Sequence, residues 1–274
     1  MIQIEDTGKV RKFRLARGLF GKGWYFTAAY WVDGLLVDSG CFYTAEELVK
    51  AVESLPLQLI VNTHSHEDHV GANASLQAGR GVPVLAHRQA LPVLEDPSLN
   101  RLHPYQRVLW GRPHACRPAA IPDVVETEHY RFHVIHTPGH SPDHICLFEP
   151  SQGWLFAGDT YVGGQDRTLR ADYNIWGIVS SLKKLIMLEP AVLFPGSGTV
   201  RDEATKELRK KISYLEEMGQ KVQAMHKRGW SMRRIARTFG ADPVLTCITV
   251  GHFSSTNLVR SFIEDFEEPG EERS

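Results

Sequence analysis

Short apolar runs separated by glycines and turn residues dominate the first 40 residues of the chain. Three of these runs are rich in aromatic and β-branched side chains, which is typical of strands. They are Val10 to Leu15, Trp24 to Val32 and Leu35 to Val37. Asp33-Gly34, between the second and the third, is a sequence that favours a tight hairpin turn. The pattern therefore predicts an N-terminal antiparallel sheet.

The pattern then alternates between a helix and a strand. Thr44 followed by Glu47 has the spacing of a capping box and predicts a helix that ends near Pro56. The run Leu57 to Val61 predicts a short, mostly apolar strand that leads directly into Asn62-Thr63-His64. Strands that alternate with helices indicate a layered α/β arrangement, in which helices cover the sheet.

The middle of the chain continues in the same way. Apolar runs predict further strands at Val82 to Ala86, Tyr130 to His136, Ile145 to Phe148, Trp154 to Ala157 and Ala191 to Phe194. A helix is expected from Ile178 to Leu188. Residues 91–122 are rich in Pro, Arg and His and lack a clean period, yet they contain Tyr105 and Trp110. We expect them to form a lid or loop insertion, because long irregular insertions in compact domains tend to be functional.

The last quarter of the chain is helical in pattern. Residues 203–227 are strongly helical and charged, and shorter helical segments are expected at Met232 to Thr238 and near Asn257 to Phe266. We therefore predict a main domain over residues 1–202 and a C-terminal helical appendage over residues 203–274. The appendage could pack over the site or form a homodimer contact. The acidic tail after Glu267 is expected to be frayed.

The composition excludes several classes of protein. The 274 residues carry 31 Lys and Arg against 32 Asp and Glu, which disfavours a nucleic-acid binder because no basic excess is present to neutralise phosphates. No apolar run approaches the roughly 20 residues of a membrane helix, and the first six residues do not read as a signal peptide. The four cysteines are widely spaced. Free thiols in a reducing cytoplasm are the expectation.

A cluster of candidate metal-binding residues closely follows the strand predicted at Leu57 to Val61. His64-Ser65-His66-Glu67-Asp68-His69 places three histidines and two carboxylates in six residues. Side chains alternate along extended backbone, so His64, His66 and Asp68 point to one side, and a turn after Asp68 would bring His69 back. Imidazole nitrogens and carboxylate oxygens are the donors that zinc, iron and manganese accept. This segment therefore predicts a metal site.

Two further candidate ligands follow later strands. His140 lies in Thr137-Pro138-Gly139-His140, shortly after the run that ends at His136. Asp159 lies in Gly158-Asp159, directly after the run that ends at Ala157. A glycine before each residue allows close backbone approach, so both side chains can project into a shared cleft.

With these motifs in this order, the sequence resembles the metallo-β-lactamase superfamily over roughly residues 10–200. The resemblance implies an α/β (α+β) fold, a four-layer αβ/βα sandwich of two mixed sheets flanked by helices. It also implies two divalent metal ions at one edge, zinc in the first place and iron or manganese as alternatives. The implied ligands are His64, His66 and His140 for the first ion, Asp68 and His69 for the second, and Asp159 as a bridge.

The chain departs from the family pattern at one position. The family usually adds a histidine to the second metal in a Pro-Gly-His-Gly setting, whereas here the stretch is Pro195-Gly196-Ser197-Gly198. A serine hydroxyl is a poor ligand compared with imidazole, so the second ion should bind less tightly, and Ser197 becomes a candidate substrate contact. His252, in the C-terminal appendage, is a candidate replacement ligand. A structural role or a substrate contact for His252 stays open.

These residues favour a metal-dependent hydrolase in which a metal-bound hydroxide attacks a small-molecule ester, lactone, thioester or related substrate. Asp68 could orient the nucleophile or accept a proton, and Tyr173 could donate a hydrogen bond to the substrate oxygen. Two alternatives stay open. One is a mononuclear iron enzyme similar to the sulfur dioxygenases of the superfamily, and the other is a non-catalytic binding protein on the same fold.

Overall fold

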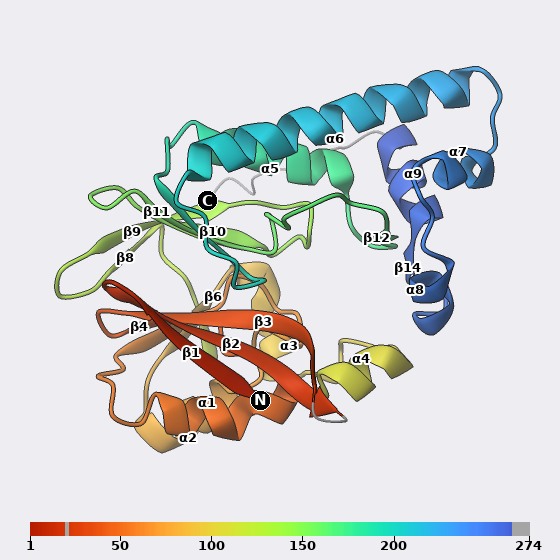
Figure 1. The fold of residues 1–274 in the computed structure, drawn as a ribbon. Coiled ribbons are helices and arrows are strands. Elements are labelled where there is room, and N and C mark those ends of the chain that lie inside the picture. The colour runs from red at the N-terminus through yellow and green to blue at the C-terminus, as the bar shows by residue number, and fades with distance from the viewer. Residues whose placement is uncertain (20–21, 265–274) are drawn as a thin grey trace.

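The computed structural model describes residues 1–19 and 22–264, and within them the chain forms two large mixed β-sheets packed face to face. Figure 1 shows helices α5 (Ile175–Ile186) and α6 (Ala204–Lys227) over the outer face of one sheet, and α1 (Ala45–Ala51) and α2 (Asn73–Arg80) against the outer face of the other. The predicted four-layer α/β sandwich is confirmed.

The first sheet contains the N-terminal strands and has the order β1-β2-β3-β4-β5-β6-β7. The pairs from β1 to β4 are antiparallel, and those from β4 to β7 are parallel. Its strands are β1 (Ile2–Thr7), β2 (Val10–Leu19), β3 (Lys22–Val32), β4 (Leu35–Val37), β5 (Leu59–Val61), β6 (Val84–Ala86) and β7 (Pro118–Ala120). The edge strand β1 was not among the predicted runs.

The second sheet has the order β13-β11-β10-β9-β8, with β11 and β13 parallel and the other pairs antiparallel. Its strands are β8 (Val124–Glu126), β9 (Arg131–His136), β10 (Ile145–Glu149), β11 (Trp154–Gly158) and β13 (Val192–Pro195). A separate ribbon joins β12 (Leu169–Arg170) to β14 (Phe253–Ser254) and so ties the C-terminal segment to the loop after β11.

The remaining helices are short. They are α3 (Leu91–Glu95), α4 (Pro104–Leu109), α7 (Met232–Thr238), α8 (Pro243–Ile248) and α9 (Ser255–Ile263). Figure 1 shows α7, α8 and α9 together at one side of the sandwich. None of the described helices combines the length and apolar character that crossing a bilayer requires.

The continuous apolar runs in the sequence arise because the central strands are buried on both faces. Leu59 and Val61 of β5 join the core between the two sheets, whereas Ile60 packs in the core beneath α1 and α2. In β11, Phe156 faces the core between the sheets and Leu155 joins the core beneath α5 and α6. Successive side chains of a strand point to opposite faces, so burial of both faces leaves no polar alternation.

The capping box predicted at Thr44 is wrong. A 3₁₀ turn over Phe42–Thr44 precedes α1, and the Thr44 hydroxyl donates to the carbonyl oxygen of Cys41 at 3.0 Å instead of capping the helix. Glu47 instead accepts a hydrogen bond from the N-terminal amine of Met1 at 2.6 Å. The local hydroxyl-to-backbone bond competes with helix capping, as is common for threonine.

The two predicted additions to the sandwich contain regular structure. Residues 91–122 include α3, α4 and β7, and β7 extends the first sheet beside β6. In the C-terminal part, α6 and α9 share one apolar core with α5, through Leu182, Leu215 and Phe262 among others. The division at residue 202 stays a prediction. The predicted helix near Asn257 to Phe266 is α9, and the end of that prediction and the acidic tail lie outside the described residues.

Candidate metal centre

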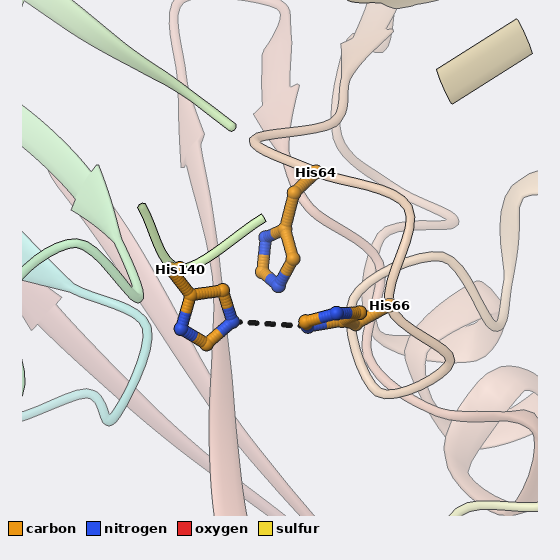
Figure 2. Close-up of side chains that lie close together, drawn as sticks. All are labelled: His64, His66 and His140. Carbon is orange, nitrogen blue, oxygen red and sulfur yellow. Dashed lines mark hydrogen bonds between the residues drawn. The ribbon is translucent and has the colours of Figure 1, made fainter. Parts of the chain in front are cut away.

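Loops that follow strands of both sheets meet at one edge of the sandwich. His64 and His66 follow β5 of the first sheet, whereas His140 follows β9 of the second. One ring nitrogen from each of the three histidines lies within 4.8 Å of the others. Figure 2 shows the three rings directed toward one another, with His140 Nε2 hydrogen-bonded to His66 Nδ1 at 2.9 Å. Residues that are 74 positions apart are thus brought into one group.

A second group shares His64 with the first. His64, His69 and Asp159 also offer donor atoms within 4.8 Å of one another. His69 Nε2 lies 3.5 Å from Asp159 Oδ2 and 3.8 Å from an oxygen of Asp68. Two donors on one tetrahedral zinc ion, each bonded at 2.0 to 2.1 Å, are about 3.4 Å apart. The spacing of these side chains is therefore close to that of a metal ligand set.

Two buried nitrogen atoms support this interpretation independently of distance. Within the described residues, His64 Nε2 and His69 Nε2 are buried and have no hydrogen-bond partner. Burying a polar atom without a partner costs about 1 to 3 kcal/mol, and native proteins rarely leave such atoms unsatisfied. A metal ion bound in each donor group would give each of these nitrogen atoms a partner, so the residues present fit such ions.

Burial keeps the histidines of the first group neutral. It is the largest cause that lowers the pKa of His64 and of His66 well below the ordinary value. Neighbouring imidazoles lower both pKa values further, and Arg170 also lowers that of His66. Burial also lowers the pKa of His140 to about 4. A metal ion requires unprotonated ring nitrogens, so these three residues are competent ligands at neutral pH.

The acidic residues and His69 shift one another's pKa values. Burial opposes charge on His69, but Asp159, Asp38 and Asp68 outweigh it and raise the pKa of this residue. Burial likewise opposes charge on Asp159, yet His69 holds the pKa of that carboxyl below its ordinary value. Burial raises the pKa of Asp68 to about 7, against the opposing effect of His69. Negative charge is thus concentrated at Asp159, where a cation would be attracted.

A carboxylate that the sequence analysis missed orients this group. Asp38 directly follows β4 and is buried. Its carboxylate accepts hydrogen bonds from His69 Nδ1 at 2.8 Å and from the amide and hydroxyl of Thr63 at 2.7 and 2.8 Å. The bond to Nδ1 directs His69 Nε2 toward Asp159, as carboxylates behind metal-bound histidines do. The signal for Asp38 was its position at the end of an apolar run, before Ser39-Gly40.

His144 supports the other side of the centre. It is fully buried, its Nδ1 lies 2.9 Å from Thr137 Oγ1, and its Nε2 accepts the backbone N–H of Asp159 at 3.1 Å. The residue therefore fixes the loop that carries Asp159.

Ser197 lies in the turn after β13, next to the second group. A Cβ added at Gly196 would lie 2.1 Å from an oxygen of Asp159 and 3.0 Å from a ring carbon of His69. The backbone before Ser197 therefore touches both side chains, and only glycine fits there. This contact places residue 197 beside the second group.

Replacing Ser197 by histidine is expected to raise the affinity for a second ion by about tenfold or more. Even residues that only hydrogen-bond to metal ligands change the metal affinity by 10- to 100-fold, and a direct ligand should contribute at least as much. Titration of metal-free protein with zinc, followed by elemental analysis, measures the effect, with Ser197→Ala as the control. An unchanged second-site affinity would mean that residue 197 does not reach this ion.

His252 lies in a different cluster. Its Nδ1 is hydrogen-bonded to the hydroxyl of Tyr105 at 2.8 Å, and its ring stacks on His103 with centroids 4.0 Å apart. Its Nε2 lies 3.7 Å from Asp172, which also pairs with Arg170. Both groups of candidate metal ligands form without His252. We therefore leave it out of the proposed ligand set.

A large cavity opens from the centre. Its volume is about 870 Å³, and its wall includes His140, Asp159 and Tyr173. The Tyr173 hydroxyl is hydrogen-bonded to His140 Nε2 at 3.1 Å, and burial raises the pKa of this phenol well above its ordinary value. Tyr173 therefore keeps its proton and presents a donor beside the centre.

Comparison of the sequence with models of known protein families tests the family membership that these motifs predict. The model of the metallo-beta-lactamase superfamily matches residues 23–197. The chain belongs to the metallo-beta-lactamase superfamily. The match spans β3 to Ser197 and thus contains every proposed ligand, and the predicted family membership is confirmed.

Individual relatives agree with this assignment. A hydroxyacylglutathione hydrolase of Haemophilus influenzae is 31% identical over 170 residues, which cover 57% of this chain and 76% of the relative. An atrochrysone carboxyl ACP thioesterase of Aspergillus fumigatus is 28% identical over 210 residues, which cover 74% of this chain but only 43% of the relative. A metallo-beta-lactamase structure from Pontibacter korlensis has a TM-score of 0.63 at 20% identity and covers 79% of this chain and 99% of that one, which shows the shared fold. The chain is thus a metallo-hydrolase of the metallo-beta-lactamase superfamily, as predicted.

Proposed function

We propose that the protein hydrolyses a small-molecule carboxylic thioester or ester with the help of two metal ions, zinc in the first place. The observation that carries the proposal is the pair of donor groups that share His64 at the head of a cavity of about 870 Å³. Pockets of 300 to 1,000 Å³ are the usual size for small-molecule ligands.

The ligand roles follow from the two groups. His64, His66 and His140 would hold the first ion, and His69 with Asp159 and Asp68 would hold the second, with Asp159 between the two. When bound, such ions lower the pKa of a coordinated water to about 7 and polarise a carbonyl oxygen.

The surrounding residues would position the substrate. Asp68 lies beside His69 and Asp159, where its carboxylate can orient the attacking water or hold its proton. The protonated Tyr173 hydroxyl is placed to donate to the oxygen on which negative charge develops. Ser197, next to Asp159 across Gly196, is a candidate contact for the leaving group.

Thioesters are the favoured substrates because two relatives are named for acting on them. One is named a hydroxyacylglutathione hydrolase and the other an acyl carrier protein thioesterase. Simple esters and lactones share the same carbonyl chemistry and stay within the proposal.

We also propose a reducing, cytoplasmic setting. Cys41, Cys116 and Cys146 are buried free thiols, and Cys247 is an exposed one. An exposed free thiol is typical of proteins that are kept under reducing conditions. Association as a homodimer stays a prediction.

The test combines metal content with turnover. Purified protein should contain close to two zinc ions per chain and release thiol from acyl thioesters in a colorimetric assay. One iron ion per chain, with oxygen uptake in the presence of a persulfide, would support a sulfur dioxygenase instead. Binding of a thioester analogue without turnover by the metal-loaded protein would support a non-catalytic role.

A further inference from the structure

The cavity extends far beyond the metal centre. It runs from His140 and Asp159 past Tyr173 to helix α8, where Val244 and Ile248 form part of its wall. Its other walls come from α4, the loop between β11 and β12, and α6. Figure 1 shows α4 and α8 on the same side of the molecule, so segments distant in sequence enclose this space.

Most of this wall is apolar. Ile175, Ile178 and Leu215 are buried at its base, and Leu109 and Leu245 also line it. A substrate that fills the cavity therefore meets hydrocarbon over most of its length, where burial of apolar surface is the favourable term.

Several polar residues of the wall already have partners within the protein. Lys211 forms a buried ion pair with Asp166. Asp242 caps α8 by accepting the N–H of Leu245 at 2.9 Å, and the hydroxyl of Thr249 donates to the carbonyl oxygen of Leu245 at 2.8 Å. These groups do not need a polar ligand to satisfy them.

Exposed apolar side chains surround the same cavity. Val244 and Ile248 of α8 are 67% and 62% exposed, and Val108 of α4 is 53% exposed. Tyr25 of β3 and Val162 also line the cavity and are exposed. Single exposed apolar residues are ordinary, but a group around one opening marks a binding site.

We propose that the acyl part of the substrate is a medium- or long-chain apolar group, which lies in this cavity with its carbonyl at the metal centre. The proposal rests on the hydrolase function above and specifies its substrate class. The cavity is much larger than a two- to four-carbon acyl group needs, and its walls offer the longer chain a continuous apolar surface.

Chain length gives a quantitative expectation. Burying one methylene group changes an equilibrium or a rate constant by about fourfold. We therefore expect kcat/KM to rise by up to about fourfold per methylene from acetyl through octanoyl thioesters, and to level off once the cavity is filled.

A double variant of two exposed residues at the cavity opening tests where the acyl chain lies. Val244→Gln combined with Ile248→Gln changes two exposed residues and should leave the fold intact. The ratio of kcat/KM for dodecanoyl to acetyl thioester should fall by about tenfold. The matched control is Met187→Gln, because Met187 is 79% exposed and is not part of the cavity wall, so its ratio should stay unchanged.

The outcomes separate this inference from the proposed function. A chain-length profile that is flat or falls, with clear hydrolysis of acetyl thioester, would overturn the acyl-chain proposal and leave the hydrolase intact. If no thioester, ester or lactone is hydrolysed but dodecanoate binds the wild type about tenfold more tightly than the Val244→Gln, Ile248→Gln variant, the hydrolase proposal fails and the apolar site stands. Absence of both turnover and dodecanoate binding would overturn both.

Discussion

Replacing His66 by alanine is expected to lower kcat/KM by about 10³-fold or more and to reduce the metal content of the purified protein. The residue is buried, and its Nδ1 lies 2.9 Å from His140 Nε2 within the first ligand group. A metal ion supplies several kcal/mol of transition-state stabilisation, and about 4 kcal/mol corresponds to a factor of 10³ in rate. Thiol release from the best thioester substrate and elemental analysis measure the two effects.

The control is His226→Ala, which removes an exposed histidine from helix α6. This variant should keep wild-type activity and metal content. Thermal unfolding of both variants separates loss of the site from loss of the fold. A folded His66→Ala protein that retains full activity and full metal content would contradict the ligand assignment.

Replacing Asp38 by asparagine is expected to lower the affinity for the second metal ion by 10- to 100-fold. This is the usual effect of losing a carboxylate that is hydrogen-bonded to a ligating histidine. The substitution keeps the size of the side chain. It removes charge from a group that accepts hydrogen bonds from His69 and from the amide and hydroxyl of Thr63. Competition with a chromophoric chelator measures the affinity of each ion.

Asp123→Asn is the matched control, because Asp123 is an exposed aspartate that directly precedes β8. Its zinc affinities should equal those of the wild type. If Asp38→Asn is folded and binds both ions with unchanged affinity, Asp38 does not orient His69 toward a metal.

The sequence was most informative where chemistry and strand ends coincide. His64 and His66 follow a short apolar run, and the alternation of extended backbone predicts that they share a side. His140 and Asp159 follow other apolar runs, and the structure brings both beside His64. Their roles as ligands stay predictions, but their convergence is a property of the fold.

Asp38 shows what a local pattern cannot resolve. A single aspartate before Ser39-Gly40 is typical of a turn, and only the pairing of β4 with β5 places it next to Thr63. Thr44 shows the converse, because a good capping motif formed a different local hydrogen bond. The outcome at Thr44 depends on a competing local hydrogen bond, whereas the position of Asp38 depends on a strand pairing that the local sequence does not specify.

The cavity could not be foreseen for the same reason. Its wall combines α4, the β11–β12 loop, α6 and α8, and no periodicity in one segment reports which distant segment will face it. His252 illustrates the limit, since it was a candidate ligand by residue type, whereas the ribbon between β12 and β14 holds it near Tyr105 and Asp172.

Anomalous X-ray scattering from zinc-loaded crystals tests the central claim most directly, because it locates the ion without assuming any activity. We expect a strong peak at the zinc edge about 2.0 to 2.1 Å from one ring nitrogen each of His64, His66 and His140. Crystals of protein that carries stoichiometric zinc but shows no peak among these three histidines would contradict the assignment of these residues as metal ligands.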